Sequence, residues 1–543
     1  MAQGGAKAPL AGRPPRVGRP SPRCPPSLRQ PACGGPDGVT TTERSTTMEN
    51  RSSSMEEWSL DTINEYCEKH FGGKILCELS ETKGRIMVAQ QDFPQGEILF
   101  SEPPLHIAQE DEDNEAFCAL RDLYNGDQDS FDYEPLWYWA ALVSLTEEQL
   151  KKGPRIGTLP SVTATQQRQL LCLYHEPVTE ASDPVKRILK KIGLKVSAVL
   201  VEELLQAWIL NCFEHSEDPQ GYSAYFASSF ASHSCRPNAI WREGEDALHI
   251  LRAREEIAKG DEITISYLEE HVLLQSAESR IKSLQDTKLF VCGCERCAPA
   301  PDAPADDLGT DRCRGFHCRS CGECAVFHRL RPRGKGEGKG KGKGLRGVKC
   351  TACGAQVQES EAVRLAQRES DLRDKLDALD EQVSEKGIGK VMQENRAQSL
   401  LRLVASGESG PIGPQHWLCD RLWEHLQGWY GSRGNHKEQR RLQKLRVDYQ
   451  RKAYPGLSGT LAWTLEEQAD TLLRHLGFGA KMLQSDGEHG GDMAAQVKPA
   501  LEESLRIFRL MFGKDDENST KVQKKLHLAE QFLAKRASQG AGP

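Results

Sequence analysis

The spacing of apolar and polar residues predicts strands near the start of the folded chain, followed by helices. Between residues 75 and 104, short apolar runs alternate with polar residues around a Pro-Gln-Gly turn, a pattern typical of strands. Residues 111–199 are more polar and have mostly helical spacing. Residues 196–213 predict one strong helix, because the large apolar side chains share a face. Strands return over residues 239–267, where strict alternation predicts a strand that ends at Tyr267.

Apolar residues recur at helical spacing through the C-terminal third of the chain. They are Leu365, Leu372, Leu376, Leu379 and Val383 in one stretch, and Leu501, Leu505, Phe508 and Phe512 in another. No fixed repeat period accompanies this spacing, so it does not indicate a strict solenoid. We therefore predict an α-helical C-terminal domain over residues 358–543. Its tryptophans are expected to pack between helices rather than line a peptide groove; they are Trp417, Trp423 and Trp429.

Two further stretches are candidates for a targeting signal and for a membrane span. Residues 1–54 lack apolar periodicity and are rich in Pro, Gly, Arg and Ser, so we predict a disordered segment. The prolines disfavour the amphipathic helix that a transit peptide needs. The longest apolar stretch, residues 196–210, is interrupted by Glu202 and Glu203. It is therefore unsuited to crossing a bilayer, and we expect no membrane contact.

Composition directs attention to cysteine chemistry. The chain has 543 residues, enough for about three or four domains, and 38% of them are hydrophobic. A net charge of −7 excludes a protein whose whole surface binds nucleic acid. Nine of the 18 cysteines lie between Cys292 and Cys353, several at CxxC spacing. In a long chain, this clustering indicates metal ligands in a reducing compartment rather than a disulfide scaffold.

The first cysteine motif is a C-x-C-x-x-C run formed by Cys292, Cys294 and Cys297. It brings three thiolates within reach of one ion, and tetrahedral Zn²⁺ needs a fourth ligand. Cys235 is the nearest upstream candidate, and spacing alone is a weak argument for it. The alternative interpretation is a group of reduced surface cysteines.

The second cysteine motif consists of two CxxCG knuckles, which are typical of a zinc ribbon. The paired residues are Cys318 with Cys321 and Cys350 with Cys353. We expect the ribbon-like segment to span residues 298–357. The choice of first pair stays open, because Cys313 and Cys324 lie close by and Cys324 could pair with Cys321 instead.

A Gly/Lys stretch, residues 333–347, lies between the two knuckles. A flexible, solvated loop is the simpler interpretation. The alternative is a weak electrostatic contact with nucleic acid or with an acidic protein surface. The stretch has no interleaved aromatic residues that would stack on bases, so we expect no base-specific binding.

Three ordered segments resemble a known family. They are Ser232–Asn238 (SHSCRPN), Gly260–Tyr267 (GDEITISY) and Phe290–Cys297 (FVCGCERC). Their order and separation resemble the catalytic half of a SET domain with its post-SET zinc site. The C-x-C-x-x-C form and the helical C-terminus are most similar to the SET and MYND family, although the MYND zinc finger is missing. The resemblance implies that Cys235 is the fourth metal ligand of the first motif.

SET domains transfer a methyl group from S-adenosylmethionine to a lysine amine. The resemblance therefore implies a protein-lysine N-methyltransferase whose cofactors are S-adenosylmethionine and Zn²⁺. The lysine must be neutral to react, and a desolvating channel lowers its pKa. The family tyrosine that lines this channel matches Tyr267, which would align the amine. The implied cofactor contacts are Lys83, Gly84, Arg85, Asn211, Ser232, His233 and Phe290.

Three residues depart from the family pattern. Ile86 replaces the second glycine of the cofactor segment, Ser232 replaces an asparagine, and Lys288 stands where a second channel tyrosine is frequent. These departures motivate two alternatives. One is a catalytically inactive SET-domain scaffold, and the other is a nucleic-acid- or chromatin-binding protein in which the SET fold is secondary.

Together these inferences predict an α+β protein. A β-rich SET domain with a helical insert, about 111–199, and the post-SET zinc motif is expected over residues 55–297. The ribbon-like segment 298–357 then leads to the all-α domain 358–543. The expected substrate is a lysine side chain of a protein, histone or non-histone. Nuclear and cytoplasmic residence are both compatible with the sequence.

Overall fold

The computed structural model describes residues 59–81, 83–151, 153–299, 309–330, 344–387, 412–478 and 490–540. Within these residues, no helix combines the length and apolar character needed to span a bilayer. The segment 1–54 and most of the Gly/Lys stretch 333–347 lie outside the described residues. The disorder of the former and the nucleic-acid or acidic-surface contact of the latter therefore stay predictions.

The chain divides into two units, and the second is built from two separate parts of the sequence. Of the described residues, the first unit contains 104–229, and the second contains 59–103 and 230–540. The region 111–199, for which the sequence predicts helices, lies within the first unit. The predicted domain boundaries near residues 54, 297 and 357 stay predictions.

The first unit combines a small sheet with short helices. Its antiparallel strands have the order β4 (His106–Gln109), β6 (Gln220–Ala224) and β5 (Phe213–Glu217). Its helices are α2 (Glu115–Asn125), α3 (Pro135–Leu142), α4 (Glu147–Leu150), α5 (Ala164–Cys172), α6 (Asp183–Ile192) and α7 (Ala198–Asn211). Helices α2 to α6 occupy the region predicted to be helical, and α7 matches the strong helix predicted over 196–213.

Helix α3 packs at the centre of the first unit because apolar side chains cover all of its sides. Pro135 begins the helix, where its missing N–H is tolerated. Trp137 stacks on Tyr222 of β6, with 4.4 Å between ring centroids. Trp208 of α7 donates from Nε1 to the Ser144 hydroxyl at 2.8 Å. The helices and the sheet of this unit therefore share one aromatic core.

Two sheets form the early part of the second unit, after a helix over residues 59–71. One has the strand order β1 (Ile75–Ser80), β2 (Gly84–Ala89), β10 (Glu262–Ile265) and β7 (Ser232–His233). The other has the order β3 (Ile98–Glu102), β9 (His249–Ala253) and β8 (Ala239–Glu243). The strand patterns recognised over 75–104 and 239–267 are confirmed.

Strand β10 ends at Ile265, two residues before the end predicted from the alternation. The backbone N–H of Tyr267 donates to His233 Nδ1 at 3.0 Å, so a side chain takes the place of a strand partner. The Ser266 hydroxyl then donates to the Leu268 carbonyl and accepts from the Leu268 N–H. Local side-chain bonds of this kind compete with strand pairing, which explains the earlier end.

A third sheet takes two of its strands from the cysteine-rich stretch between Cys292 and Cys353, with the order β12 (Cys324–Arg329), β11 (Thr310–His317) and β13 (Ile412–His416). Strand β13 lies within the domain predicted to be all-α, so that prediction was wrong at these residues. Its sequence, IGPQH, contains a glycine and a proline, which both disfavour a helix. Gly413 also lets the strand approach closely, because a Cβ there would overlap the Cys324 thiol.

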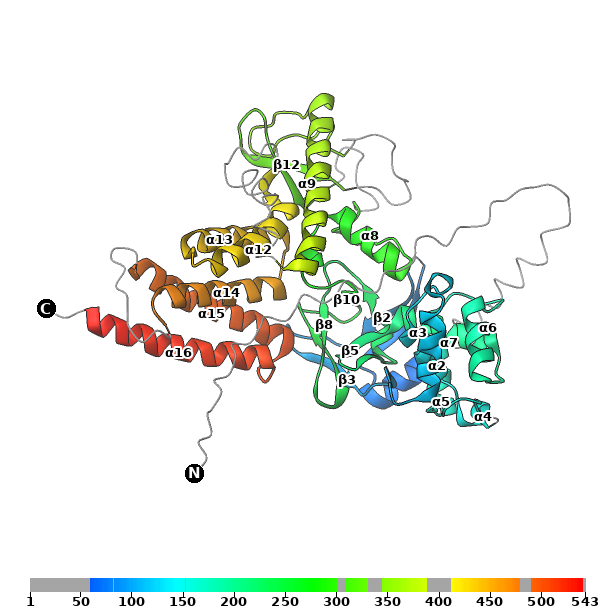
Figure 1. Cartoon of the computed structure of the whole chain (residues 1–543). Coiled ribbons are helices and arrows are strands. Elements are labelled where there is room, and N and C mark those ends of the chain that lie inside the picture. The colour runs from blue at the N-terminus through cyan, green and yellow to red at the C-terminus, as the bar shows by residue number, and fades with distance from the viewer. Residues whose placement is uncertain are drawn as a thin grey trace. The chain divides into compact units, whose positions relative to one another are not determined.

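The other helices of the second unit follow the predicted apolar spacing. They are α8 (Ala277–Lys288), α9 (Glu359–Lys386), α12 (Trp417–Ser432), α13 (His436–Ala453), α14 (Gly459–His475), α15 (Gly490–Phe512) and α16 (Glu517–Gly540). From α12 to α16, successive helices stack on one another (Figure 1). Trp417 and Trp423 of α12 are buried and Trp429 is partly buried, as expected of packing residues.

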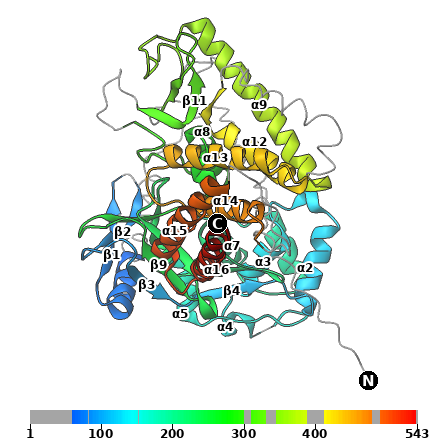
Figure 2. The same ribbon diagram turned by 90° about the vertical axis from the view of Figure 1, so that its left-hand side faces the viewer.

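A buried ion pair joins the long helix α9 to the third sheet, which lies beside it in Figure 2. Arg314 of β11 donates to both carboxylate oxygens of Glu369 in α9, at 2.6 and 2.7 Å. His416 of β13 places Nε2 at 3.3 Å from the same carboxylate. Although burial opposes ionisation, Arg314 and His416 hold the pKa of Glu369 well below its usual range. Loss of Glu369 would therefore leave the buried Arg314 guanidinium with only the more exposed Glu278 carboxylate, at 2.8 Å.

We predict that Glu369→Ala lowers the free energy of unfolding by about 3 kcal/mol, because the Arg314 guanidinium loses its main counter-charge. Chemical denaturation followed by tryptophan fluorescence measures the change. Asp377→Ala on the same helix is the matched control, since Asp377 pairs with Arg421 while its side chain is 55% exposed. That control should cost about 1 kcal/mol or less. Equal losses in the two variants would contradict the proposed role of the buried pair.

Candidate active site and metal centres

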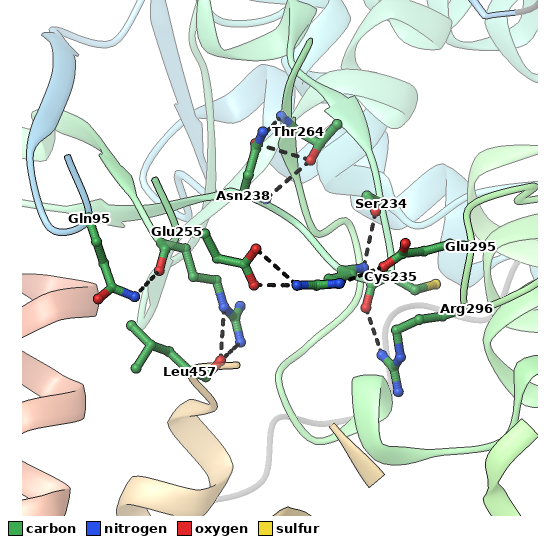
Figure 3. Close-up of polar contacts among 11 residues, drawn as sticks. Gln95, Ser234, Cys235, Asn238, Glu255, Thr264, Glu295, Arg296 and Leu457 are labelled. Carbon is green, nitrogen blue, oxygen red and sulfur yellow. Dashed lines mark hydrogen bonds and ion pairs between the residues drawn. The ribbon is translucent and has the colours of Figure 1, made fainter. Parts of the chain in front are cut away.

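The three segments that resemble SET motifs converge on one sheet of the second unit. Strand β10 pairs antiparallel with β2 and parallel with β7. Asn238, at the end of the SHSCRPN segment, holds this arrangement with its side-chain amide. It accepts from the Thr264 N–H at 2.8 Å (Figure 3). It also donates to the Glu262 carbonyl at 2.8 Å. The loop that carries Cys235 is thereby tied to the strand that leads to Tyr267.

Tyr267 directs its hydroxyl at a backbone carbonyl. The hydroxyl donates to the Ala231 carbonyl at 2.8 Å, while 38% of the residue's surface is exposed. Desolvation of the hydroxyl, together with the charge of Glu262, raises the pKa of Tyr267 above its usual value. The phenol is therefore protonated at neutral pH. Its oxygen keeps lone pairs that can accept a further hydrogen bond.

His233 connects Tyr267 to the first cysteine motif. Burial lowers the pKa of His233 to about 4, so the ring is neutral near pH 7. Its Nδ1 accepts from the Tyr267 N–H, which assigns the ring proton to Nε2. Nε2 lies 3.3 Å from Cys235 Sγ and can donate to it. The His233 ring therefore links the Cys235 sulfur to the backbone N–H of Tyr267, so the position of one depends on the other.

Phe290 completes a small aromatic group with these two rings. Its ring centroid lies 5.9 Å from that of His233 and 6.2 Å from that of Tyr267. The His233 and Tyr267 centroids are 5.3 Å apart. Lys288 is the last residue of α8, and the apolar side chains of Leu289 and Val291 that flank Phe290 are exposed. Three residues singled out from the sequence therefore lie together, next to an exposed apolar surface.

Glu262 holds two predicted cofactor residues in place. Its carboxylate accepts from Lys83 Nζ at 2.5 Å and also from the Ser232 hydroxyl. Lys83 lies in the turn before β2, and Ser232 begins β7, so one side chain joins three strands of the sheet. The serine that replaces the family asparagine thus makes a defined contact of its own.

Gly84 adopts a left-handed backbone with φ of 70°. A side chain there would be strained, although no atom lies within 4 Å of the position that a Cβ would occupy. Arg85 turns away from this open space, since its guanidinium lies 4.8 Å from the centroid of the Phe230 ring and donates to the Ser59 hydroxyl. Ile86 lies within β2, opposite Glu78 of β1.

Asn211 is the last residue of α7 in the first unit. Its side-chain amide nitrogen donates to the Ala207 carbonyl at 2.7 Å and to the Tyr174 carbonyl at 2.8 Å. Its backbone carbonyl accepts from the Ser229 hydroxyl. Both donor positions of the amide are thus used locally, and the side-chain oxygen is the atom that remains for a ligand.

The first cysteine cluster contains the four residues proposed from sequence. The sulfur atoms all lie within 4.8 Å of one another; they belong to Cys235, Cys292, Cys294 and Cys297. The sulfur atoms of Cys235 and Cys297 lie 3.4 Å apart. A tetrahedral ion with bonds of about 2.3 Å holds sulfur atoms about 3.8 Å apart. The cluster therefore has the donor chemistry and the size to hold a metal ion.

Two arginines surround this cluster with positive charge. Arg280 of α8 is buried and lies 3.6 Å from the Cys297 sulfur. Although burial opposes it, the Cys297 and Cys235 thiols raise the pKa of Arg280 well above its usual value. Arg296, inside the CxxC turn, donates to the Cys235 carbonyl at 2.7 Å (Figure 3). Such charges compensate the negative charge of four metal-bound thiolates.

The second cysteine cluster resolves the choice that the sequence left open. The residues whose sulfur atoms come together are Cys318, Cys321, Cys350 and Cys353. Sulfur separations of 3.6 Å for Cys318–Cys353 and 3.8 Å for Cys321–Cys350 again suit a tetrahedral ion. Although partial burial opposes it, the backbone amides of Cys321 and Ser320 lower the pKa of Cys318 to about 6. Cys313 and Cys324 lie on strands β11 and β12, outside the cluster.

Sequence reasoning missed the roles of four residues in and around the site. They are Asn238, Glu262, Arg280 and Arg296. Asn238, Glu262 and Arg296 stand inside segments quoted for the resemblance, so a signal was present without a role. Arg280 lies outside those segments and contacts Cys297 across 17 residues of sequence, and no spacing pattern identifies it.

Residues 84–268 match the SET domain family. This match, with the convergence of β2, β10 and β7 on Tyr267, shows that the chain contains a SET domain. The fold is a mixture of helix and strand followed by a largely helical C-terminal region. The part of the predicted fold class that concerns the SET domain is therefore confirmed.

Curated relatives extend this assignment. "Histone-lysine N-methyltransferase ASHR1" of Arabidopsis thaliana is 24% identical over 259 residues, 40% of this chain and 53% of that protein. Human "Protein-lysine N-trimethyltransferase SMYD5" is 38% identical over 97 residues, 18% of this chain and 21% of that protein. Mouse "Histone-lysine N-methyltransferase SMYD3" is 41% identical over 92 residues, 17% of this chain and 20% of that protein. The chain thus spans about half the length of the first relative and about a fifth of the others. The expected relationship to the SET and MYND family is confirmed.

Proposed function

We propose that this chain is an S-adenosylmethionine-dependent protein-lysine N-methyltransferase that acts on a histone or non-histone protein. The main observation in favour is the setting of Tyr267, whose hydroxyl donates to the Ala231 carbonyl while its ring borders an exposed apolar surface. The SET domain over residues 84–268 and the methyltransferase names of the relatives support the same class.

The residues around Gly84 suit the cofactor that SET domains use. The open space over Gly84 and its left-handed backbone leave room for close approach of a ligand. Lys83 and the backbone of His233 border the same sheet, and the Phe290 ring offers an apolar face for a base. When bound, S-adenosylmethionine supplies a methyl group on a positively charged sulfur. By resemblance, Asn211 holds the amino-acid end of the cofactor.

The tyrosine aligns and dehydrates the substrate amine. Because its hydroxyl proton is engaged by Ala231, the Tyr267 oxygen accepts an N–H from the neutral lysine and fixes its direction. Phe290 and His233 exclude water from the same space, which lowers the pKa of the amine. With the cofactor bound, the methyl group would pass from its sulfur to the lysine nitrogen that Tyr267 aligns, and the surplus proton of the methylated amine would leave to solvent.

The departures from the family pattern are compatible with activity. Ser232 replaces an asparagine and binds Glu262, which also holds Lys83. Ile86 belongs to the regular part of β2, two residues after the open turn at Gly84. We therefore favour an active enzyme over a catalytically inactive scaffold.

We predict that Tyr267→Phe lowers the methylation rate by about 100-fold or more, because the amine loses its hydrogen-bond acceptor. Cofactor affinity should change less than about threefold, since the phenol lies on the substrate side. Labelled methyl transfer into cell-lysate proteins measures the rate, and Tyr430→Phe on α12 is the control. Equal labelling by the wild type and Tyr267→Phe would point to the inactive scaffold.

Cofactor binding can be tested without a known substrate. Titration calorimetry with S-adenosylmethionine and S-adenosylhomocysteine should give micromolar affinity. Asn211→Ala should weaken binding about tenfold, the effect of one hydrogen bond to a charged group. Asn125→Ala is the matched control, because Asn125 also ends a helix of the first unit, α2. A folded protein that binds neither molecule would contradict the proposed function.

We further propose that both cysteine clusters hold Zn²⁺, the first as a post-SET site and the second as a zinc ribbon. Four thiolates at tetrahedral spacing are the donor set that structural zinc prefers. The reducing compartment implied by the unpaired cysteines keeps these thiols available. The second cluster supports a structural role, since it joins the two knuckles of the third sheet.

The zinc proposal predicts two ions per chain after native purification. Cys292→Ser and Cys350→Ser should each reduce the count to one, since three ligands hold zinc less tightly. Elemental analysis measures the stoichiometry. Cys324→Ser, outside both clusters, should retain two ions. A count of one in the wild type would exclude one of the sites, and a count of zero would exclude both.

A further inference from the structure

Helix α13 carries four cations on one face, at the i, i+3, i+4 and i+7 positions that lie together on a helix. They are Lys437, Arg440, Arg441 and Lys444. These side chains line a cavity of about 250 Å³, which we call the α13 cleft. Leu472 of α14 and Met493 of α15 form its buried floor. The cleft lies within the helical stack of the second unit, apart from the SET domain residues described above.

Arg440 gives this cleft an unsatisfied donor. Its Nη1 is buried and makes no hydrogen bond within the described residues. Burial alone lowers the pKa of Arg440, with no carboxylate opposing the effect. A guanidinium donor removed from water without a partner is costly, so such donors normally face an acceptor. The missing acceptor is the observation that points to a ligand.

Two other arginines of α13 are paired with carboxylates. Arg451, two turns further along α13, pairs with Glu503, and Arg446 pairs with Asp420. Lys437 and Lys444 differ, since neither has an ion-pair partner among the residues that the structure describes. Arg441 reaches Glu438 of its own helix, and no acidic residue lines the cleft. Glu438 compensates only Arg441, so the charges of Lys437, Arg440 and Lys444 still repel one another without a carboxylate between them.

We infer that the α13 cleft binds a compact polyanion that carries two or more phosphate groups. One carboxylate would neutralise only one of the four charges, whereas a diphosphate brings several charges into a small volume. The Arg440 guanidinium matches phosphate oxygens as a two-pronged donor, and the lysines act as point charges around it. The amides of Gln468 and Gln496, at the edge of the cleft, add neutral donors. This site goes beyond the proposed methyl transfer and does not depend on it.

Inorganic pyrophosphate is the probe that tests this inference. Titration calorimetry uses the full chain with its zinc content checked before and after, because pyrophosphate can chelate metals. We expect saturable binding of one pyrophosphate per chain, with affinity that falls as salt is raised. Arg440→Gln should weaken it at least tenfold. Lys444→Gln, at an exposed position, should weaken it as well and guards against misfolding of the first variant.

Arg451→Gln is the matched control, since it removes a charge from the same helix outside the cleft. It should leave pyrophosphate affinity unchanged. The inference fails if pyrophosphate does not saturate, or if Arg440→Gln and Lys444→Gln bind it as tightly as the wild type. It also fails if a hexaglutamate peptide binds more tightly than pyrophosphate and displaces it, which would assign the cleft to an acidic peptide.

Discussion

The first cysteine cluster would concentrate negative charge in a buried place once its thiols ionise to bind a metal, and neighbouring arginines are placed to balance that charge. Arg296 does so from within the cluster's own turn, and the same guanidinium donates to the Ala453 carbonyl at the end of α13. Tyr454 follows, with its ring between Arg296 at 4.8 Å and Arg254 at 5.0 Å. Through His233, the cluster also fixes the backbone of Tyr267. Tyr267 and the helical stack are therefore anchored to one polar centre.

Buried ion pairs recur at two of the junctions between elements of the second unit. Arg254 donates to Glu270 at 2.6 Å and to the Leu457 carbonyl at 3.0 Å, so the SET domain holds the turn between α13 and α14. Arg314 and Glu369 do the same for the third sheet and α9. Removing such charges from water costs free energy, and the attraction between the paired charges offsets that cost only when their geometry is correct. These junctions therefore favour a single arrangement of the elements over many similar ones.

Patterns along the sequence predicted much of the fold, because the spacing of apolar residues and of cysteines reflects interactions between residues that are near in sequence. Alternation located the strands, helical spacing located α7, α9 and α15, and cysteine spacing located both clusters. Strand β13 was not predicted from the sequence, because the strand is only five residues long and shows too little periodicity. Its pairing partner, β11, also lies far upstream in the sequence. The positions of Glu262 and Arg280 likewise follow from pairing between distant segments. The sequence left open whether Cys318 or Cys324 joins Cys321 in the first knuckle. Cys324 belongs to strand β12 and lies outside the cluster, so the pair is Cys318 and Cys321.

Strand β13 also constrains how the chain folds. It pairs Ile412 with Phe316 of β11, so the third sheet has one edge supplied from a much later part of the polypeptide. Loop-closure entropy makes such a distant pairing slow relative to the hairpin of β11 and β12. During synthesis, the knuckles of the second cluster emerge and can bind metal while that edge is still unpaired. The metal-stabilised hairpin would then serve as the template onto which the later strand adds, so assembly proceeds from the ribbon outward to the helical stack.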